Sequence, residues 1–144
     1  MPLTDTDRAA CLVRAIEATV AGDASAVGEL FTDHVVGWSP PVRVSSREEL
    51  AVELEDREDA FSELELDVKP ISVCRDSACV EWVATALHSG PYPFDENRMI
   101  PATGRRITLH GVSVADFEGD RIRSFRHYWD EVELLDGLGL RSHD

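Results

Sequence analysis

Hydrophobic residues in the first third of the chain recur every three to four positions, the spacing of one face of a helix. In the opening segment these positions are Ala9, Leu12, Val13, Ile16 and Val20. Gly22-Asp23 then ends the predicted helix. A short second helix over 26–31 follows so closely that the two helices must fold back on each other. A strand is expected at 32–38.

The residues Ser46-Arg47-Glu48-Glu49 have the pattern of a capping box and predict the start of a third helix. Ser46 is expected to accept a hydrogen bond from the backbone N–H of Glu49, and the Glu49 carboxylate to reach back to the N–H of Ser46. Leu50 and Leu54 would then face inward.

From residue 63 onward the hydrophobic period changes from helical spacing to alternation, which is typical of half-buried strands. Alternating segments predict long strands at 64–73, 78–88, 106–117 and 121–132, joined by short turns. The stretch 91–103 between the second and third of these strands is expected to be a loop or lid. The tail, 133–140, reads as a short apolar cap.

Helices that come first and strands that come later predict an α+β fold. A strongly curved antiparallel sheet packed on the three N-terminal helices would form a cone with one open end, which is a natural place for a small-molecule pocket. The chain has 144 residues, so we expect one domain over 1–144.

The net charge of the chain is −14, which argues against nucleic acid or an anionic membrane surface as a partner. The first residues do not form a basic start followed by an apolar stretch, so we expect a cytoplasmic protein. Three cysteines in a chain of this length do not make a disulfide framework, and we expect free thiols.

The last predicted strand holds the densest set of candidate functional residues. Alternation places Ser124, Arg126, Tyr128 and Asp130 on one face and Phe125, His127, Trp129 and Glu131 on the other. The first face is mostly polar, so it must either meet solvent or line a cavity. A three-residue turn would set His110 opposite Tyr128, a two-residue turn would set it opposite His127, and a bulge would change the pairing again.

The available chemistry is that of carboxylate and imidazole groups. No serine has the context of a nucleophile elbow, no glycine-rich loop follows a strand, and His110 and His127 do not form a helical metal pair. Carboxylate and imidazole suit proton transfer, in particular proton abstraction next to a carbonyl. Burial of Asp130 inside the cone would raise the pKa of its carboxyl group toward the working range.

Several segments of the chain together resemble the SnoaL-like polyketide cyclase family of the nuclear-transport-factor-2-like superfamily, whose fold is also called cystatin-like. The segments are Ala21-Gly22-Asp23, Leu30-Phe31-Thr32-Asp33-His34-Val35-Val36, Gly104-Arg105-Arg106, Phe117-Glu118-Gly119-Asp120-Arg121-Ile122, Tyr128-Trp129-Asp130 and the tail from Leu134 to Leu140.

The resemblance implies a cone-shaped α+β barrel that forms a homodimer through its sheet and uses neither a metal nor an organic cofactor. Cyclases of this family close a ring by intramolecular aldol condensation. An Asp on the final strand acts as acid and base there, with a His on the neighbouring strand. Asp130 and His110 are the residues here that stand on those strands.

The leading hypothesis is therefore a cofactor-independent acid/base enzyme for a small, largely apolar carbonyl compound. Asp130 would take the proton, and His110 or Tyr128 would bind the enolate. The remaining substrate-binding candidates are Arg126 beside Asp130, His88 at the mouth, and Trp38, Trp82 and Phe94 as apolar walls.

Three alternatives stay open. An epoxide hydrolase would need a second carboxylate bridged by Arg, and a ketosteroid-type isomerase would need a second deep acid, for which Asp116 lies too near a turn. The third is a non-catalytic small-ligand-binding or dimerisation module.

Overall fold

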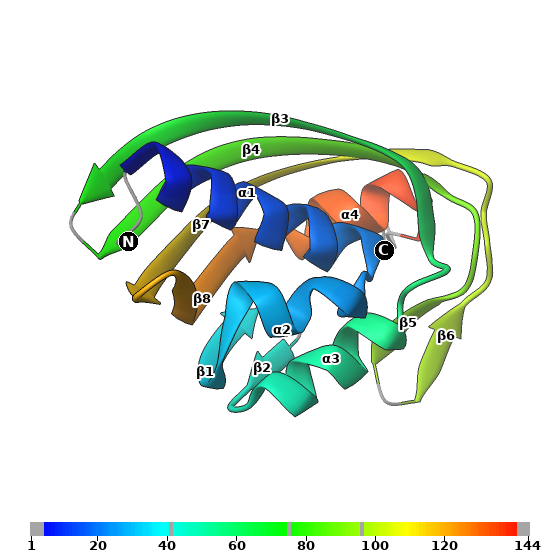
Figure 1. Ribbon diagram of the computed structural model, residues 1–144. Helices are drawn as coiled ribbons and strands as arrows, with labels where there is room; N and C mark the ends of the chain where they lie inside the picture. Colours follow the sequence, from blue (N-terminus) through cyan, green and yellow to red (C-terminus); the bar gives the residue numbers. More distant parts are fainter. Residues whose placement is uncertain (1–4, 41, 75, 96, 141–144) are drawn as a thin grey trace.

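A curved six-stranded sheet arches over the N-terminal helices, as Figure 1 shows. The computed structural model describes residues 5–140 apart from positions 41, 75 and 96, together with the side chains at most of these positions. The strands of the sheet lie in the order β2-β1-β8-β7-β4-β3. They are β1 (Phe31–Ser39), β2 (Val42–Val44), β3 (Phe61–Cys74), β4 (Ser77–His88), β7 (Arg106–Glu118) and β8 (Arg121–Trp129). The predicted α+β fold is confirmed.

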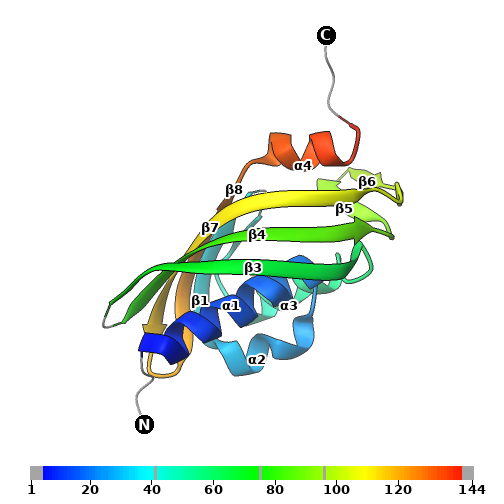
Figure 2. The same cartoon turned by 90° about the horizontal axis from the view of Figure 1, so that it is seen from above.

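The four long strands, β3, β4, β7 and β8, pair antiparallel to one another, whereas β1 pairs parallel to β8. The long helix α1 (Asp5–Ala21) lies along the concave face beneath β3 and β4. A single helical turn (Ala24–Ala26), α2 (Val27–Leu30) and α3 (Arg47–Glu55) complete the helical layer on the same side, as Figure 2 shows. The concave face therefore becomes the hydrophobic core.

The third helix starts where the sequence predicts. Ser46 Oγ accepts a hydrogen bond from the N–H of Glu49 at 3.1 Å, which satisfies one of the donors left open at a helix start. The Glu49 carboxylate reaches back one residue further than in a capping box, because it accepts from the N–H of Ser45 at 3.1 Å. Leu50 and Leu54 are buried, as expected.

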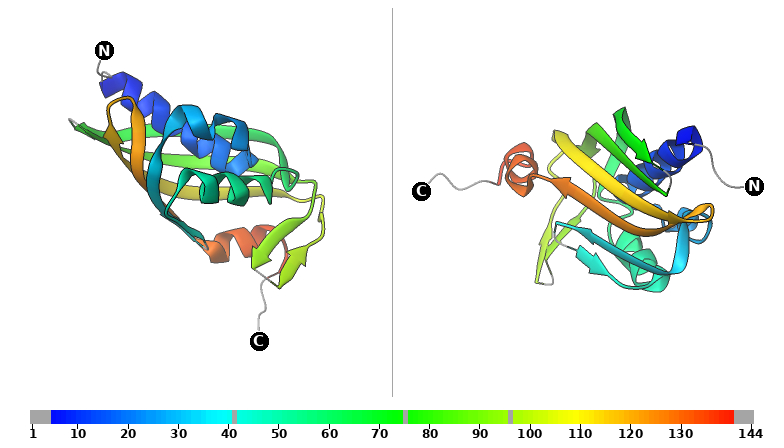
Figure 3. Two further views of the ribbon diagram at one scale, coloured as in Figure 1. Left: turned by 60° about the horizontal axis from the view of Figure 1, so that its bottom comes forward. Right: turned by 90° about the vertical axis from the view of Figure 1, so that its left-hand side faces the viewer.

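The end of the chain differs from its prediction. Strand β8 stops at Trp129, and Asp130 is the N-cap of a fourth helix, α4 (Glu131–Gly137), whose second residue, Val132, donates its N–H to Asp130 Oδ1 at 2.8 Å. An Asp ahead of Glu-Val-Glu-Leu-Leu is a helix-start signal that outweighs continuation of the strand. Figure 3 shows α4 beyond the end of the sheet.

The segment expected to be an irregular loop contains a small hairpin, β5 (Tyr92–Asp95) and β6 (Arg98–Ile100). This hairpin projects from the end of the long strands in Figure 1. Within the described part of the chain, no helix is long and apolar enough to cross a membrane.

Trp82 of β4 lies across the backbone of β7 in the core. A Cβ atom at Gly111 would stand 2.1 Å from the Trp82 ring, so only glycine leaves room for the indole there. Trp82 is 2% exposed and makes an edge contact with Trp129. The close approach of ring and strand thus depends on a single missing methyl group.

We predict that Gly111→Ala lowers the free energy of unfolding by about 1–3 kcal/mol, because the indole must move out of its packed position. Urea unfolding followed by tryptophan fluorescence measures this change. Gly28→Ala is the control, since nothing lies within 4 Å of a Cβ atom there. Its helical position predicts an unchanged or slightly raised stability. Equal stability of Gly111→Ala and the wild type would contradict the packing argument.

Candidate functional site

The expected catalytic carboxylate does not lie in the hollow of the sheet. Asp130 is exposed at the start of α4, where its side chain caps the helix. The expectation that this carboxyl group is shielded from water is therefore wrong, for the reason that the chain turns into a helix at that residue. Its assignment to catalysis stays a prediction.

His110 also faces outward from β7, with 63% of its side chain exposed. Its Nδ1 lies 2.8 Å from Glu133 Oε2, and its backbone N–H donates to Glu133 Oε1 at 2.6 Å. One carboxylate of α4 thus binds both the ring and the backbone of His110. The interaction ties the C-terminal helix to β7, an internal strand of the sheet.

The polar face of β8 is the outer face of the sheet. Arg126 pairs with Asp116 at 3.5 Å rather than with Asp130, and Asp116 also accepts from the Ser124 hydroxyl at 2.7 Å. Tyr128 stacks on Trp38 with 5.0 Å between ring centroids. His110, Tyr128 and Asp130 do come together, but as the lining of an open depression on this outer face.

The register of the β7–β8 hairpin explains this grouping. Glu118 pairs with Arg121, so the turn is Gly119-Asp120, and a bulge after Asp116 moves the pairing so that Gly111 lies opposite Trp129. Just beyond this pair, His110 precedes Gly111 in the chain and Asp130 follows Trp129. Both turns considered from sequence begin at Glu118, so neither produces this register: the turn begins one residue later, and the bulge adds one residue, Arg123, to β8.

The face of β8 that carries Phe125 and His127 points into the core, where a hydrogen-bonded chain crosses three strands. The indole N–H of Trp82 in β4 donates to Ser113 Oγ in β7 at 2.9 Å. Ser113 Oγ lies 2.6 Å from His127 Nδ1 in β8. All three side chains are buried, and His127 Nε2 has no hydrogen-bond partner among the described residues.

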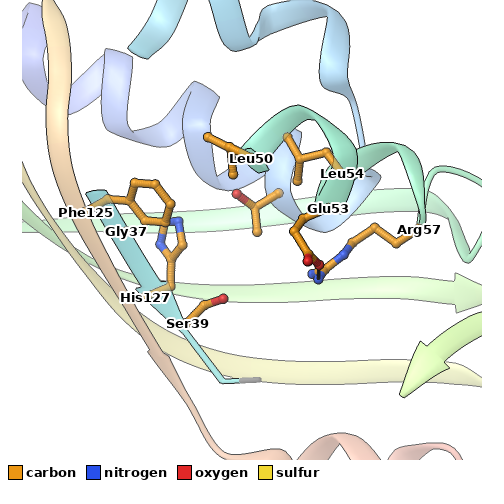
Figure 4. A pocket seen from close by; sticks show the side chains of 9 residues that line it. Gly37, Ser39, Leu50, Glu53, Leu54, Arg57, Phe125 and His127 are labelled. Carbon is orange, nitrogen blue, oxygen red and sulfur yellow. Dashed lines mark ion pairs between the residues drawn. The ribbon is translucent and has the colours of Figure 1, made fainter. Parts of the chain in front are cut away.

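His127 lines a pocket between β1, β8 and the inner side of α3. Figure 4 shows the rings of Phe125 and His127 on one side of this pocket and the side chains of Glu53 and Arg57 on the other. The remaining lining residues are Thr19, Gly37, Ser39, Leu50 and Leu54. The pocket has about 280 Å³ of empty space, part of it open to solvent, but a water molecule can centre in only about 10 Å³ of it. It therefore has room for about one water molecule.

Arg57 brings a buried positive charge to this pocket. Its Nη2 lies 3.9 Å from Glu53 Oε2, its side chain is 9% exposed, and its Nε atom finds no partner in the part of the chain that the structure describes. A guanidinium is always protonated, so its charge must be balanced locally. Glu53, with 41% of its side chain exposed, supplies that balance from the rim.

Two glycines hold the turn that carries Arg57. A Cβ atom at Gly22 would stand 2.6 Å from the Glu58 backbone, and one at Gly90 would stand 1.9 Å from the Asp59 carbonyl oxygen. The end of α1 and the end of β4 therefore approach this turn backbone to backbone. The Gly22-Asp23 pair that ends the first helix in the sequence thus also positions a residue of the pocket.

Burial controls the protonation of the imidazole in this pocket. Desolvation, with a smaller contribution from the positive charge of Arg57, lowers the pKa of His127 from 6.5 to about 4. His127 is therefore neutral at pH 7. Burial also raises the pKa of Tyr92 to about 12, with Glu131 and Arg57 close enough to influence it.

The other expected site residues divide between core and surface. Trp82 and His88 face the core, and His88 Nδ1 accepts a hydrogen bond from the N–H of Thr103 at 3.1 Å. The side chain of Phe94 lies outside the described part of the structure. Trp38 is half-buried next to Tyr128.

Sequence reasoning missed His127, Arg57 and Glu53 as a group. The apolar neighbours of His127 on its face of the strand, Phe125 and Trp129, were the signal that this face is the inner one. Arg57 stands in an acidic stretch that reads as a solvated surface, so nothing local marks it. Within the described ranges, no three His, Cys, Asp or Glu side chains gather as a metal-ligand set.

The family follows from a match of residues 12–125 to the model of the SnoaL-like domain. This chain belongs to the SnoaL-like family. The resemblance of the sequence to these proteins is thereby confirmed, and the curved sheet over N-terminal helices agrees with it. A search of curated proteins found no match.

Solved structures with the same fold cover nearly the whole SnoaL-like domain. TsrD from Streptomyces laurentii is 18% identical with a TM-score of 0.76, and the match covers 96% of this chain and 99% of that one. IdmH from Streptomyces antibioticus, a proposed polyketide cyclase, is 22% identical with a TM-score of 0.71 over 95% and 99% of the two chains. AclR from Streptomyces galilaeus, a proposed hydroxylase, is 24% identical with a TM-score of 0.70 over 95% and 85%.

We predict that His127 makes the protein less stable in acid. The unfolded imidazole binds a proton below pH 6.5, whereas the folded one does so only below about pH 4. The free energy of unfolding should therefore fall by up to about 3 kcal/mol from this group as the pH drops through that interval.

Urea unfolding between pH 4 and pH 7.5 measures this contribution when the wild type is compared with His127→Asn. The variant retains a side-chain amide near Nδ1 but does not titrate. The stability advantage of the wild type over the variant should shrink as the pH falls. Two parallel curves would show that His127 has the same proton affinity folded and unfolded.

Proposed function

We propose that this SnoaL-like domain is a cofactor-independent acid/base enzyme for a small, largely apolar carbonyl compound, with its chemistry in the inner pocket. The observation that supports this proposal is that two residues lining one pocket, His127 and Arg57, each have a buried nitrogen atom, Nε2 and Nε, without a hydrogen-bond partner among the described residues. A buried polar atom without a partner costs about 1–3 kcal/mol, so two in one pocket favour a role in binding.

The roles of the three polar residues follow from their chemistry. A carbonyl oxygen bound at His127 and Arg57 would meet hydrogen-bond donors where negative charge develops as an enolate forms. Glu53, at the rim beside Arg57, is the carboxylate that could take the proton from the adjacent carbon. Phe125, Leu50 and Leu54 supply the apolar wall for the rest of the substrate.

The size of the pocket limits the substrate. Because there is room for one water at present, an organic molecule enters only if side chains of α3 or the Phe125 ring turn aside. The substrate is then a compact ketone or diketone, and binding is coupled to a movement of the pocket wall.

Exchange of the protons next to the carbonyl for deuterium tests this proposal, with small cyclic ketones and 1,3-diketones followed by proton NMR. Glu53→Gln should slow the exchange at least about 100-fold, because general-base catalysis of this kind contributes roughly 10²–10⁴. The substitution keeps the length of the side chain and removes only its basicity.

Asp130→Asn is the matched carboxylate-to-amide change on the outer face. Asn caps a helix as well as Asp does, so α4 should remain intact and the exchange rate should stay at the wild-type level. If Asp130→Asn abolished exchange while Glu53→Gln did not, the chemistry would belong to the outer depression with His110 and Tyr128.

A non-catalytic dimerisation module is the second candidate, and exposed apolar side chains on the outer face support it. Val36 is 50% exposed, and Tyr128, which lines the depression together with Val112, is 46% exposed. A homodimer through the sheet would cover these side chains. Such a dimer and catalysis in the inner pocket are compatible, because they use opposite faces of the sheet.

A further inference from the structure

Ser113 is the middle member of the buried chain that links Trp82 to His127. It is fully buried on β7, between the two strands that carry the aromatic and the imidazole ring. Its hydroxyl is within hydrogen-bond distance of both side chains, at 2.9 Å from Trp82 Nε1 and 2.6 Å from His127 Nδ1. The direction of these two bonds determines which nitrogen of His127 carries the proton.

The indole nitrogen sets the direction of the first bond. An indole N–H can only donate, so Ser113 Oγ must be the acceptor in the bond to Trp82. That bond uses one lone pair of the oxygen and leaves the single hydroxyl proton of Ser113 to be placed. Since the hydroxyl is buried, this proton needs an acceptor.

His127 Nδ1 is the acceptor that the geometry offers. If Nδ1 carried a proton and donated it to Ser113, the buried hydroxyl proton would lose the one side-chain acceptor that the described residues place within its reach. If Nδ1 is unprotonated, the serine donates to it and every polar atom of the chain from Trp82 to Nδ1 is satisfied. A neutral imidazole with a free Nδ1 lone pair has its proton on Nε2.

We propose that Ser113 is a positioning residue that holds neutral His127 in the tautomer protonated at Nε2, so that His127 is a hydrogen-bond donor toward the pocket. The value of this tautomer for catalysis rests on the proposed function. A donor at Nε2 binds a carbonyl or enolate oxygen, whereas an unprotonated Nε2 would repel it. In this state His127 is not the general base, which leaves that role to a carboxylate such as Glu53.

His88 provides an internal reference in the same molecule. The backbone N–H of Thr103 donates to His88 Nδ1, so His88 is held in the same tautomer by a group that Ser113 does not touch. Ser124 provides the matched substitution, since its hydroxyl donates to Asp116 on the outer face of β8. Ser124→Ala removes a hydroxyl from the same strand as His127 without reaching the ring.

Long-range proton–nitrogen correlation NMR of the ¹⁵N-histidine-labelled protein at pH 7 tests the proposal. In the wild type, His127 Nδ1 should resonate in the range of an unprotonated ring nitrogen and Nε2 in the range of a protonated one. In Ser113→Ala, both nitrogen resonances of His127 should move toward averaged positions as the second tautomer becomes populated. His88 should keep its spectrum in Ser113→Ala, and Ser124→Ala should leave both histidines unchanged.

Two results would overturn the proposal. One is a wild-type spectrum with the proton on Nδ1, which needs no variant and so does not depend on whether Ser113→Ala folds. The other is a Ser113→Ala spectrum in which His127 keeps its wild-type resonances. Because the tautomer is measured without substrate, failure of the ketone exchange experiment would count against the proposed function and not against this assignment.

Discussion

The concave side of the sheet depends on a polar connection within an apolar core: the hydrogen-bonded chain from Trp82 through Ser113 to His127. Each member comes from a different strand, and the chain forms only if β4, β7 and β8 keep their register. A slip of one residue in any of these strands would turn its member of the chain to the other face and leave polar groups buried without partners. Wrong strand pairings therefore cost more free energy through this hydrogen-bonded chain than through the surrounding aliphatic contacts. Aliphatic contacts tolerate exchange of one apolar residue for another.

The same register gives the two faces of β8 opposite roles. On the inner face, Phe125 and His127 meet α3 and the pocket. On the outer face, Arg126 and Tyr128 pair with Asp116 and Trp38 near the surface. Polar side chains on the outer face can exchange their partners for water at little cost, whereas His127 and Arg57 cannot. Chemistry that needs low dielectric and oriented donors thus has a better setting on the inner face, and association with another protein has a better setting on the outer one.

Much of the architecture could be predicted because it follows from local rules. Helical spacing placed α1, the serine cap at Ser46 placed α3, and alternation placed the four long strands and separated the two faces of the last one correctly. The apolar residues Phe125 and Trp129 indicated the inner face of that strand, but a polar strand face can meet either solvent or a cavity, so the surroundings of the polar face stayed open. His110 lies on the outer face of β7 by simple alternation with the buried Ile107 and Leu109. In β8, the bulge and the helix that begins after Asp130 place Asp130 on the outside as well.

By itself, the sequence of this SnoaL-like domain determined the element order, the strand alternation and the family, because these depend on residues close together in the chain or on motifs in a recognisable order. Only the tertiary structure brought Glu53 and Arg57 of the α3 region to His127 of β8, and only it made these groups buried. The physical reason is that burial and electrostatic environment depend on every element packed around a group. An isolated Arg in an acidic segment and an isolated His in a strand carry no local sign of the pocket that they share.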